Sequence, residues 1–233
     1  MLDAETWPTP SEPLLGDSDG ACSVGRVPAE LFDVVVLVGS LGGPEAIREI
    51  AHALPAWFPA AVLVVQHRTV AAQHITVDLL RRATRLPVEL ARDRERPCPG
   101  VVYVLPADRQ LVIGPDGSFA GVPGPRQVGC SADPLLTSIA QRVGPRALAV
   151  ILSGTNDDGA AGVVALKRAG GCVLAQNRAT ARCFTMPAAA IATGCVDLVL
   201  PVDRLAHALV SLTAWPGAAS LLRAPLAPWA VLD

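Results

Sequence analysis

A serine, a histidine and a pair of aspartates each follow an apolar run of the chain. Ser40 follows one β-branched run, His67 follows a second apolar run, and the adjacent Asp157 and Asp158 follow a third. Serine hydrolases combine a hydroxyl, an imidazole and a carboxylate: the imidazole takes the proton of the attacking hydroxyl, and the carboxylate orients the imidazole. These residue types favour Ser40 as a nucleophile and His67 as its base. Spacing alone does not choose between the two aspartates.

The residues around Ser40 form a glycine-rich turn, V-G-S-L-G-G-P over 38–44. We expect this turn to end a strand and begin a helix, where backbone N–H groups lack partners and proline is common. Such free donors suit an oxyanion hole, and they also suit phosphate binding. The hydrolase signature G-x-S-x-G is not matched, because position 38 is valine. The turn also lacks a Walker lysine and the pattern G-x-G-x-x-G, so a nucleotide-binding domain is the least favoured alternative.

Each of these residues also has an ordinary structural explanation. A single histidine is more often a hydrogen-bonded structural residue, and two aspartates at a helix start can simply cap the helix. His52, His74 and His207 fall within helical patterns, and we assign them no function. The conjunction favours a site, because a serine, a histidine and an aspartate stand at three strand ends at once. Their order along the chain differs from the Ser, Asp, His order of α/β-hydrolases, which argues against a lipase-type fold.

Strand and helix patterns alternate along most of the chain. Strands are predicted at 34–38, 61–66, 88–91, 101–105, 111–113, 147–152, 172–175 and 198–200. Helices are predicted near 44–54, 75–83, 135–142, 159–169, 187–192 and 203–212. In the second helix, Ile75, Leu79 and Ala83 share a face, and a turn at 114–117 indicates a hairpin.

This alternation predicts an α/β fold with a doubly wound, mostly parallel sheet, helices on both faces and a short β-hairpin insertion in the middle. Ligands of such sheets bind outside the carboxyl ends of the strands, where the three candidate residues stand.

The composition is that of a globular chain with little polar surface. Of 233 residues, 51% are hydrophobic and 17% charged, and the formal net charge of −2 gives no basic footprint for nucleic acid. No apolar run approaches the roughly 18 residues of a membrane span, and no signal peptide is visible, so we expect a cytoplasmic protein. The six cysteines have no C-x-x-C spacing. We therefore expect reduced thiols, no metal site and no cofactor.

The two ends of the chain differ from its body. Residues 1–30 are rich in acidic residues and proline, which predicts a flexible acidic leader. Residues 214–233 form a Pro/Ala-rich C-terminal tail. One folded domain is expected between them, over residues 31–213.

Several motifs together resemble the catalytic domain of the bacterial chemotaxis protein-glutamate methylesterases, the CheB family. They are V-G-S-L-G-G-P at 38–44, V-Q-H at 65–67 and L-S-G-T-N-D-D-G at 152–159, and further matches follow in the family's order up to residue 201. The resemblance covers about residues 33–212. It implies a serine hydrolase that removes methyl groups from glutamate γ-methyl esters of chemoreceptors through an acyl-enzyme, and that can deamidate receptor glutamines. The partner it implies is a methyl-accepting receptor, and the oligomeric state stays open.

The resemblance also assigns roles to residues. It implies Ser40 as nucleophile, His67 as base and Asp158, rather than Asp157, as the orienting acid. Backbone donors near Leu41 and Thr155 would hold the oxyanion. Many family members carry a phosphoacceptor receiver domain in front, for which residues 1–30 are too short. We therefore expect basal activity that does not respond to a phosphodonor such as acetyl phosphate.

Four positions depart from the usual pattern of the family. Leu41 replaces a threonine, Thr155-Asn156 replaces Met-Gly, and Val128 stands where a histidine is usual. These changes lie around the expected site. They motivate an alternative, a catalytically weakened receptor-binding or signalling module of the same fold.

Overall fold

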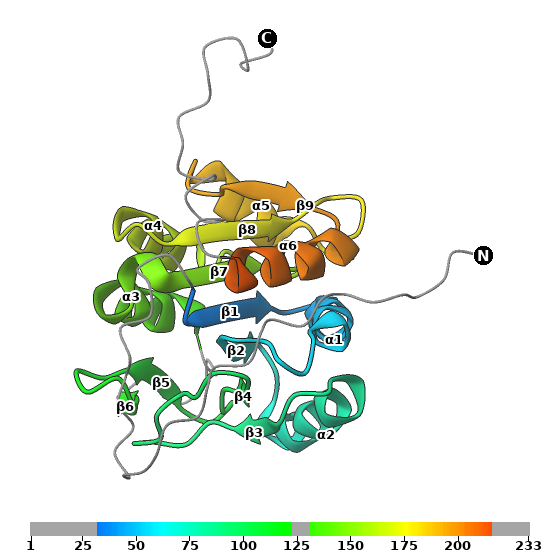
Figure 1. Ribbon diagram of the computed structural model, residues 1–233. Coiled ribbons are helices and arrows are strands. Elements are labelled where there is room, and N and C mark those ends of the chain that lie inside the picture. Colours follow the sequence, from blue (N-terminus) through cyan, green and yellow to red (C-terminus); the bar gives the residue numbers. More distant parts are fainter. Residues whose placement is uncertain (1–31, 123–130, 216–233) are drawn as a thin grey trace, which may run out of the picture.

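The computed structural model describes residues 32–122 and 131–215, and its largest element is a seven-stranded parallel sheet (Figure 1). The strands lie in the order β3-β4-β2-β1-β7-β8-β9. Their bounds are β1 Val34–Gly39, β2 Ala61–Gln66, β3 Val88–Leu90, β4 Val102–Val104, β7 Ala147–Ile151, β8 Cys172–Gln176 and β9 Leu198–Leu200. The chain runs outward from β1 to one edge and returns through β7 to the other, so the strand order reverses between β1 and β7. Open α/β sheets bind ligands at such a reversal.

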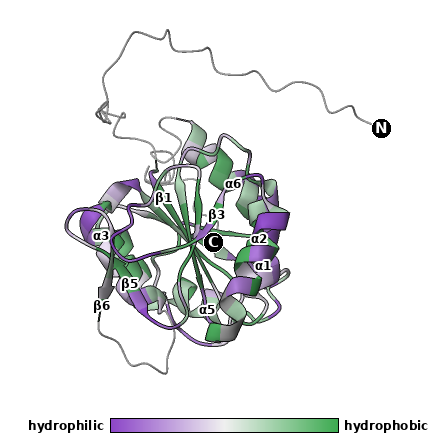
Figure 2. Cartoon of the chain, turned by 90° about the horizontal axis from the view of Figure 1, so that it is seen from below, coloured by the Kyte–Doolittle hydropathy of each residue, from purple (hydrophilic) through white to green (hydrophobic). Residues whose placement is uncertain are grey.

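Helices cover both faces of this sheet, as in a doubly wound fold. The helices are α1 Gly43–Ala53, α2 Gln73–Ala83, α3 Ala132–Arg142, α4 Ala160–Arg168, α5 Thr185–Ala192 and α6 Val202–Ala214. One face packs against α1, α2 and α6, and the other against α3, α4, α5 and the antiparallel hairpin β5 Gln110–Ile113 and β6 Phe119–Val122. Figure 2 shows the apolar strands enclosed by these more polar helices.

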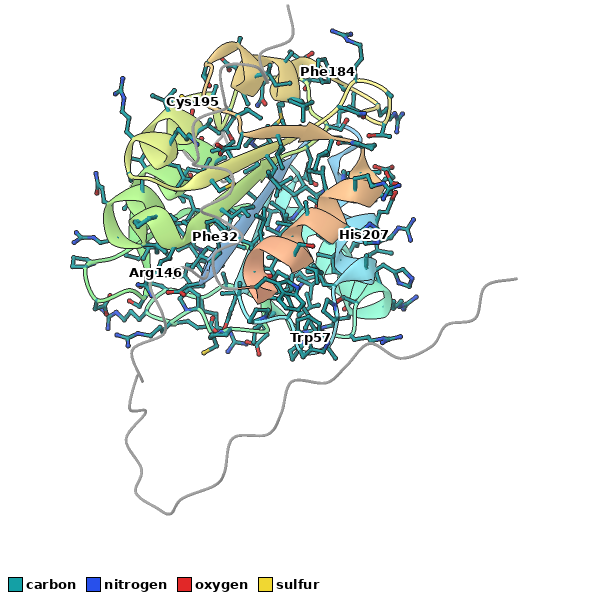
Figure 3. All side chains as sticks on the ribbon, turned by 45° about the horizontal axis from the view of Figure 1, so that its top comes forward. Phe32, Trp57, Arg146, Phe184, Cys195 and His207 are labelled. Carbon is teal, nitrogen blue, oxygen red and sulfur yellow. The ribbon has the colours of Figure 1, made fainter. Side chains whose placement is uncertain are left out.

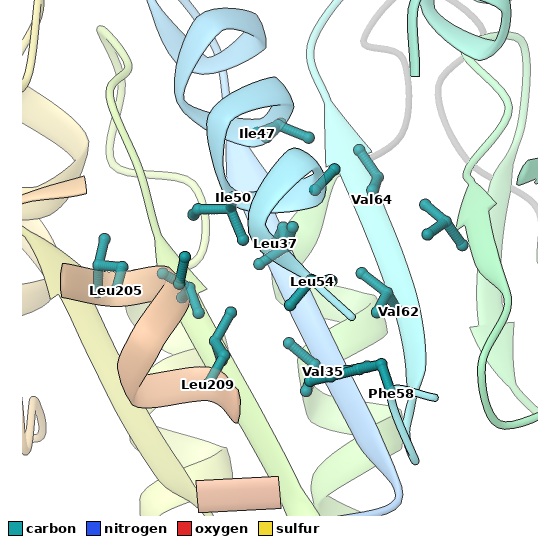
Figure 4. Packing of buried hydrophobic residues seen from close by; sticks show 14 of the residues in the cluster. Val35, Leu37, Ile47, Ile50, Leu54, Phe58, Val62, Val64, Leu205 and Leu209 are labelled. Atoms are coloured by element: carbon teal, nitrogen blue, oxygen red, sulfur yellow. The ribbon is translucent and has the colours of Figure 1, made fainter. Parts of the chain in front are cut away.

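Side-chain alternation along β1 builds the core on both faces. Val35 and Leu37 belong to one buried cluster with Ile47 and Ile50 of α1 (Figure 4). Val34, Val36 and Val38 belong to the opposite cluster, which includes residues of α3 and α4. All of β1 is buried, as expected for a central strand of a parallel sheet. This buried central strand ends at Gly39, directly before Ser40.

The expected fold class and the central hairpin are confirmed. The helix expected around Ile75, Leu79 and Ala83 forms as α2. The face that holds Ile75 and Leu79 points to solvent, since these side chains are 60% and 52% exposed, whereas Val77 and Leu80 are buried. The expected strands differ from those found by a residue or two at their ends, and the helix expected from residue 135 begins at Ala132.

Some expectations fall outside the described residues, namely the acidic leader, Val128 and the tail beyond Trp215. His52, His74 and His207 are exposed on α1, α2 and α6, and Figure 3 shows His207 on the outer side of α6. Over residues 32–122 and 131–215, no helix has the length and apolar content needed to cross a bilayer.

Candidate active site

β1 and β2 bring Ser40 and His67 to the same edge of the sheet. The two strands are parallel neighbours whose register pairs Gly39 with Gln66, so Ser40 and His67 are the next residues on each side. The backbone N–H of His67 donates to the Gly39 carbonyl at 3.2 Å, which continues the pairing by one step. β7 pairs with the other side of β1. Three segments that are far apart in sequence therefore end at one place.

The turn after Ser40 is fixed by backbone hydrogen bonds and by a glycine. The Ser40 N–H donates to the Ser153 carbonyl at 2.9 Å, and the Ser40 carbonyl accepts from the Gly43 N–H at 2.9 Å. Gly42 has a left-handed φ of 78°, and a Cβ at this position would lie 2.6 Å from both Arg182 Cβ and Ser153 Oγ. The turn thus requires glycine both for its conformation and for its space.

His67 is held by the carboxylate of Asp158. His67 Nε2 donates to Asp158 Oδ2 at 2.6 Å, and only 18% and 12% of the two side chains are exposed. The same carboxylate accepts from Ser131 Oγ at 2.5 Å, from the Ala132 N–H at 2.7 Å and from the Asp133 N–H at 3.3 Å, all at the start of α3. Burial alone would raise the pKa of Asp158, but its hydrogen bonds, led by that of His67, outweigh burial and lower the pKa below its usual value. The carboxylate is therefore ionised at neutral pH.

The structure brings one of the two adjacent aspartates to the histidine. Asp158 contacts His67, whereas the Asp157 side chain is exposed. An ionised carboxylate only accepts hydrogen bonds, so His67 carries its proton on Nε2 and leaves the lone pair of Nδ1 as its basic site. The amide nitrogen of Asn156 lies 3.3 Å from Nδ1. The Ser40 hydroxyl makes no hydrogen bond within the described residues.

Leu41 and Thr155 lie on the two loops next to Ser40. Leu41 is 50% exposed and follows the serine directly, and Thr155 is exposed on the loop after β7. Neither backbone N–H donates to an acceptor in the part of the chain that the structure describes. Two donors without partners at this edge are available to a negatively charged oxygen.

Sequence reasoning missed the residues that join these loops. Ser153 is fully buried, and its hydroxyl donates to the Leu41 carbonyl at 2.7 Å and accepts from the Cys183 N–H at 2.8 Å. The next residue, Gly154, donates to the Cys183 carbonyl at 3.0 Å and accepts from the Met186 N–H at 3.0 Å. A serine directly after a buried strand was the signal available for Ser153. Its partners lie up to 112 residues away, which no local pattern reveals.

Ser131 was also missed as a site residue. It is the N-cap of α3, and its hydroxyl bonds the Asp158 carboxylate across 27 residues. A serine before a helix ordinarily predicts a cap for that helix's own N–H groups. Here the Ser131 hydroxyl and the first N–H groups of α3 donate instead to the Asp158 carboxylate of another loop. A negatively charged group is favoured there because a helix N-terminus carries partial positive charge. No set of three or more potential metal-ligating side chains comes together within residues 32–122 and 131–215.

Comparisons with known proteins place the chain in a family. The family model described as CheB methylesterase matches residues 35–209. A protein-glutamate methylesterase/protein-glutamine glutaminase of Moorella thermoacetica is 35% identical over 84% of this chain and 48% of its own length. One of Anaeromyxobacter dehalogenans is 42% identical over 76% of this chain and 52% of its own length. The chain thus spans about half the length of these curated relatives.

The fold also matches a solved catalytic domain. The crystal structure of the Thermotoga maritima CheB methylesterase catalytic domain superposes with a TM-score of 0.73 at 32% sequence identity, covering 78% of this chain and 98% of that one. The described residues therefore correspond to a nearly complete domain of that kind. On the family model and on these relatives, the chain belongs to the CheB methylesterase family.

Proposed function

We propose that this chain hydrolyses glutamate γ-methyl esters of a methyl-accepting receptor protein, with Ser40 as nucleophile, His67 as base and Asp158 as the acid that orients the base. The observation that carries the proposal is the 2.6 Å contact of His67 with a largely buried, ionised Asp158. His67 and Ser40 each lie one residue beyond the paired ends of β2 and β1. A positioned imidazole whose Nδ1 carries the basic lone pair, on the strand end beside a serine, is the arrangement that acyl transfer needs.

The proposed reaction follows from these positions. Ser40 Oγ attacks the ester carbonyl carbon while His67 Nδ1 accepts the hydroxyl proton, and Asp158 stabilises the imidazolium that results. The backbone N–H groups of Leu41 and Thr155 stabilise the oxyanion of the tetrahedral intermediate. His67 then returns the proton to the leaving methanol, and water hydrolyses the acyl-enzyme by the same path. A receptor glutamine would react alike, with ammonia as the leaving group.

The test is methanol release from a methylated receptor protein. Ser40→Ala should lower the rate by about a thousandfold or more, because binding and oxyanion contacts alone leave little catalysis. Ser211→Ala is a matched control, since it makes the same chemical change on the exposed surface of α6. Equal rates for native chain and Ser40→Ala would refute the assignment of the nucleophile.

The same assay decides the alternative of a catalytically weakened module. Its motivation is the replacement of the usual residues at Leu41, at Thr155-Asn156 and at Val128. Receptor binding without methanol release from the native chain would establish that alternative, and turnover that depends on Ser40 would exclude it. A cytoplasmic location stays a prediction from the sequence pattern, and a receptor partner stays a prediction from the family resemblance.

A further inference from the structure

The basic nitrogen of His67 already has a neighbour that the proposed mechanism does not use. Nε2 of the imidazole donates to Asp158, so Nδ1 is the nitrogen left for the Ser40 proton. The amide nitrogen of Asn156 lies 3.3 Å from this Nδ1 and is its hydrogen-bond donor. The Ser40 hydroxyl, by contrast, makes no hydrogen bond within the described residues.

An imidazole nitrogen without a proton has a single lone pair in the plane of the ring, and this lone pair accepts one strong hydrogen bond. The Asn156 amide and the Ser40 hydroxyl therefore compete for the same site. While the amide occupies Nδ1, the serine cannot transfer its proton there.

We propose that Asn156 is a positioning residue that acts as a brake on the base: in the resting enzyme its amide occupies His67 Nδ1, and it must turn away before Ser40 can react. This inference rests on the proposed function, since it concerns the same serine and histidine. Position 156 is one at which this chain departs from the family pattern. The family usually has glycine there, which has no side chain to reach the imidazole, so the proposal gives this departure a physical role.

The contact is weak enough to be released. A distance of 3.3 Å is long for a hydrogen bond, and the Asn156 side chain is exposed. Its amide makes no other hydrogen bond within residues 32–122 and 131–215. A neutral hydrogen bond of this kind changes an equilibrium by roughly two- to tenfold. The brake therefore slows the enzyme without inactivating it.

The test measures the reactivity of Ser40 directly, as the second-order rate of labelling by a small fluorophosphonate. This reagent forms a bond from Ser40 Oγ to phosphorus and releases fluoride, and it requires the same proton transfer to His67. Asn156→Ala should raise the labelling rate by roughly two- to tenfold. Asn156→Asp should lower it below that of the native chain. This side chain has the same shape, but its carboxylate accepts a hydrogen bond from a protonated Nδ1, so it stabilises the form of His67 that cannot take the Ser40 proton.

The opposite signs of these two variants separate a contact with the base from a loosened loop. Asp157→Ala is the control for the loop, because it truncates the exposed neighbouring side chain, and it should stay within about twofold of the native rate. An equal gain in Asp157→Ala would assign the effect to loop mobility and overturn the proposal. A fall of about a hundredfold in Asn156→Ala would also overturn it, because that loss is typical of an oxyanion donor.

Labelling also keeps this inference distinct from the proposed function. Absent methanol release, with labelling that needs Ser40 and is faster in Asn156→Ala, would reject the receptor esterase and retain the brake. Methanol release that needs Ser40, with identical labelling rates in the native chain and Asn156→Ala, would support the receptor esterase and overturn the brake. Absent labelling in both chains would show that Nδ1 cannot serve Ser40 even without the amide, and this too would overturn the brake.

Discussion

The variant Gly154→Ala tests how closely Ser40, the proposed nucleophile, is packed. An ideal Cβ at position 154 would lie 1.8 Å from Met186 Sδ and 3.0 Å from Ser40 Cβ. Non-bonded heavy atoms attract best at about 3.5–4.0 Å, so the sulfur contact is about 2 Å too short. Met186 is only 1% exposed and cannot swing into solvent. The added methyl group must therefore displace Met186, Ser40 or both.

The expected effect on activity exceeds the effect on stability. Adding a methyl group to a packed core costs about 1–3 kcal/mol of the free energy of unfolding, which urea denaturation measures. Misplacing a reacting group by about 1 Å can cost about a hundredfold in rate. We therefore expect Gly154→Ala to lower methanol release by more than tenfold. Because Gly154 does not have a positive φ, backbone strain does not contribute.

Two further variants make this reasoning refutable. Gly121→Ala is a matched control, because its Cβ would meet Asp93 Oδ1 at an ordinary 3.6 Å, and it should leave rate and stability unchanged. In Gly154→Ala with Met186→Ala, the nearest clash is gone, so the double variant should be more stable than the sum of the single changes predicts. Native activity in Gly154→Ala would show that Ser40 does not depend on this close packing.

Three other changes have defined outcomes. Asp158→Asn should lower the rate of methanol release by about ten-thousandfold, because an amide no longer holds His67 in the required tautomer, and a loss below tenfold would contradict the acid's role. Asp158 should also make the free energy of unfolding fall in acid, because its pKa is lower in the folded chain than in the unfolded chain. Its stabilising contribution is complete above the unfolded-state pKa and is lost as the pH falls through the folded-state pKa. The urea midpoint of the native chain should therefore drop more steeply below about pH 5 than that of Asp158→Asn, and parallel curves would contradict this. Ser153→Ala should cost about 1–3 kcal/mol of stability in urea denaturation, because the Cys183 N–H loses its buried acceptor; an unchanged midpoint would show that this bond is dispensable.

The sequence predicts the sheet and the edge at which the site lies, because both follow from local patterns. A buried strand followed by a polar turn is visible at Ser40 and His67, and parallel strands bring their carboxyl ends to one edge. The pairing of Gly39 with Gln66 then places the two residues side by side. Strand patterns do not reveal which strands are neighbours, so the proximity of these two residues needed the structure.

Local sequence patterns do not predict contacts between distant segments, nor do they predict which face of a helix is buried. Ser131 reaches Asp158 from a helix start that a residue pattern reads as an ordinary cap. On α2, Ile75 and Leu79 form an apolar row at helical spacing, yet Val77 and Leu80 face the core. Both rows satisfy the helical period, and only packing against the sheet decides which one is buried.

The loop after β7 does more than supply the proposed acid, Asp158. Because β2 and β7 flank β1 on opposite sides, their ends are separated by two strand spacings of about 4.8 Å each. His67 and Asp158 nevertheless meet at 2.6 Å, so the loop crosses the end of β1, where Ser40 stands. Along this crossing, Gly154 limits the space beside Ser40, Asn156 contacts the basic nitrogen and Asp158 holds the other nitrogen. Substitutions in this one loop can therefore change how Ser40 and His67 meet while the sheet beneath them stays the same.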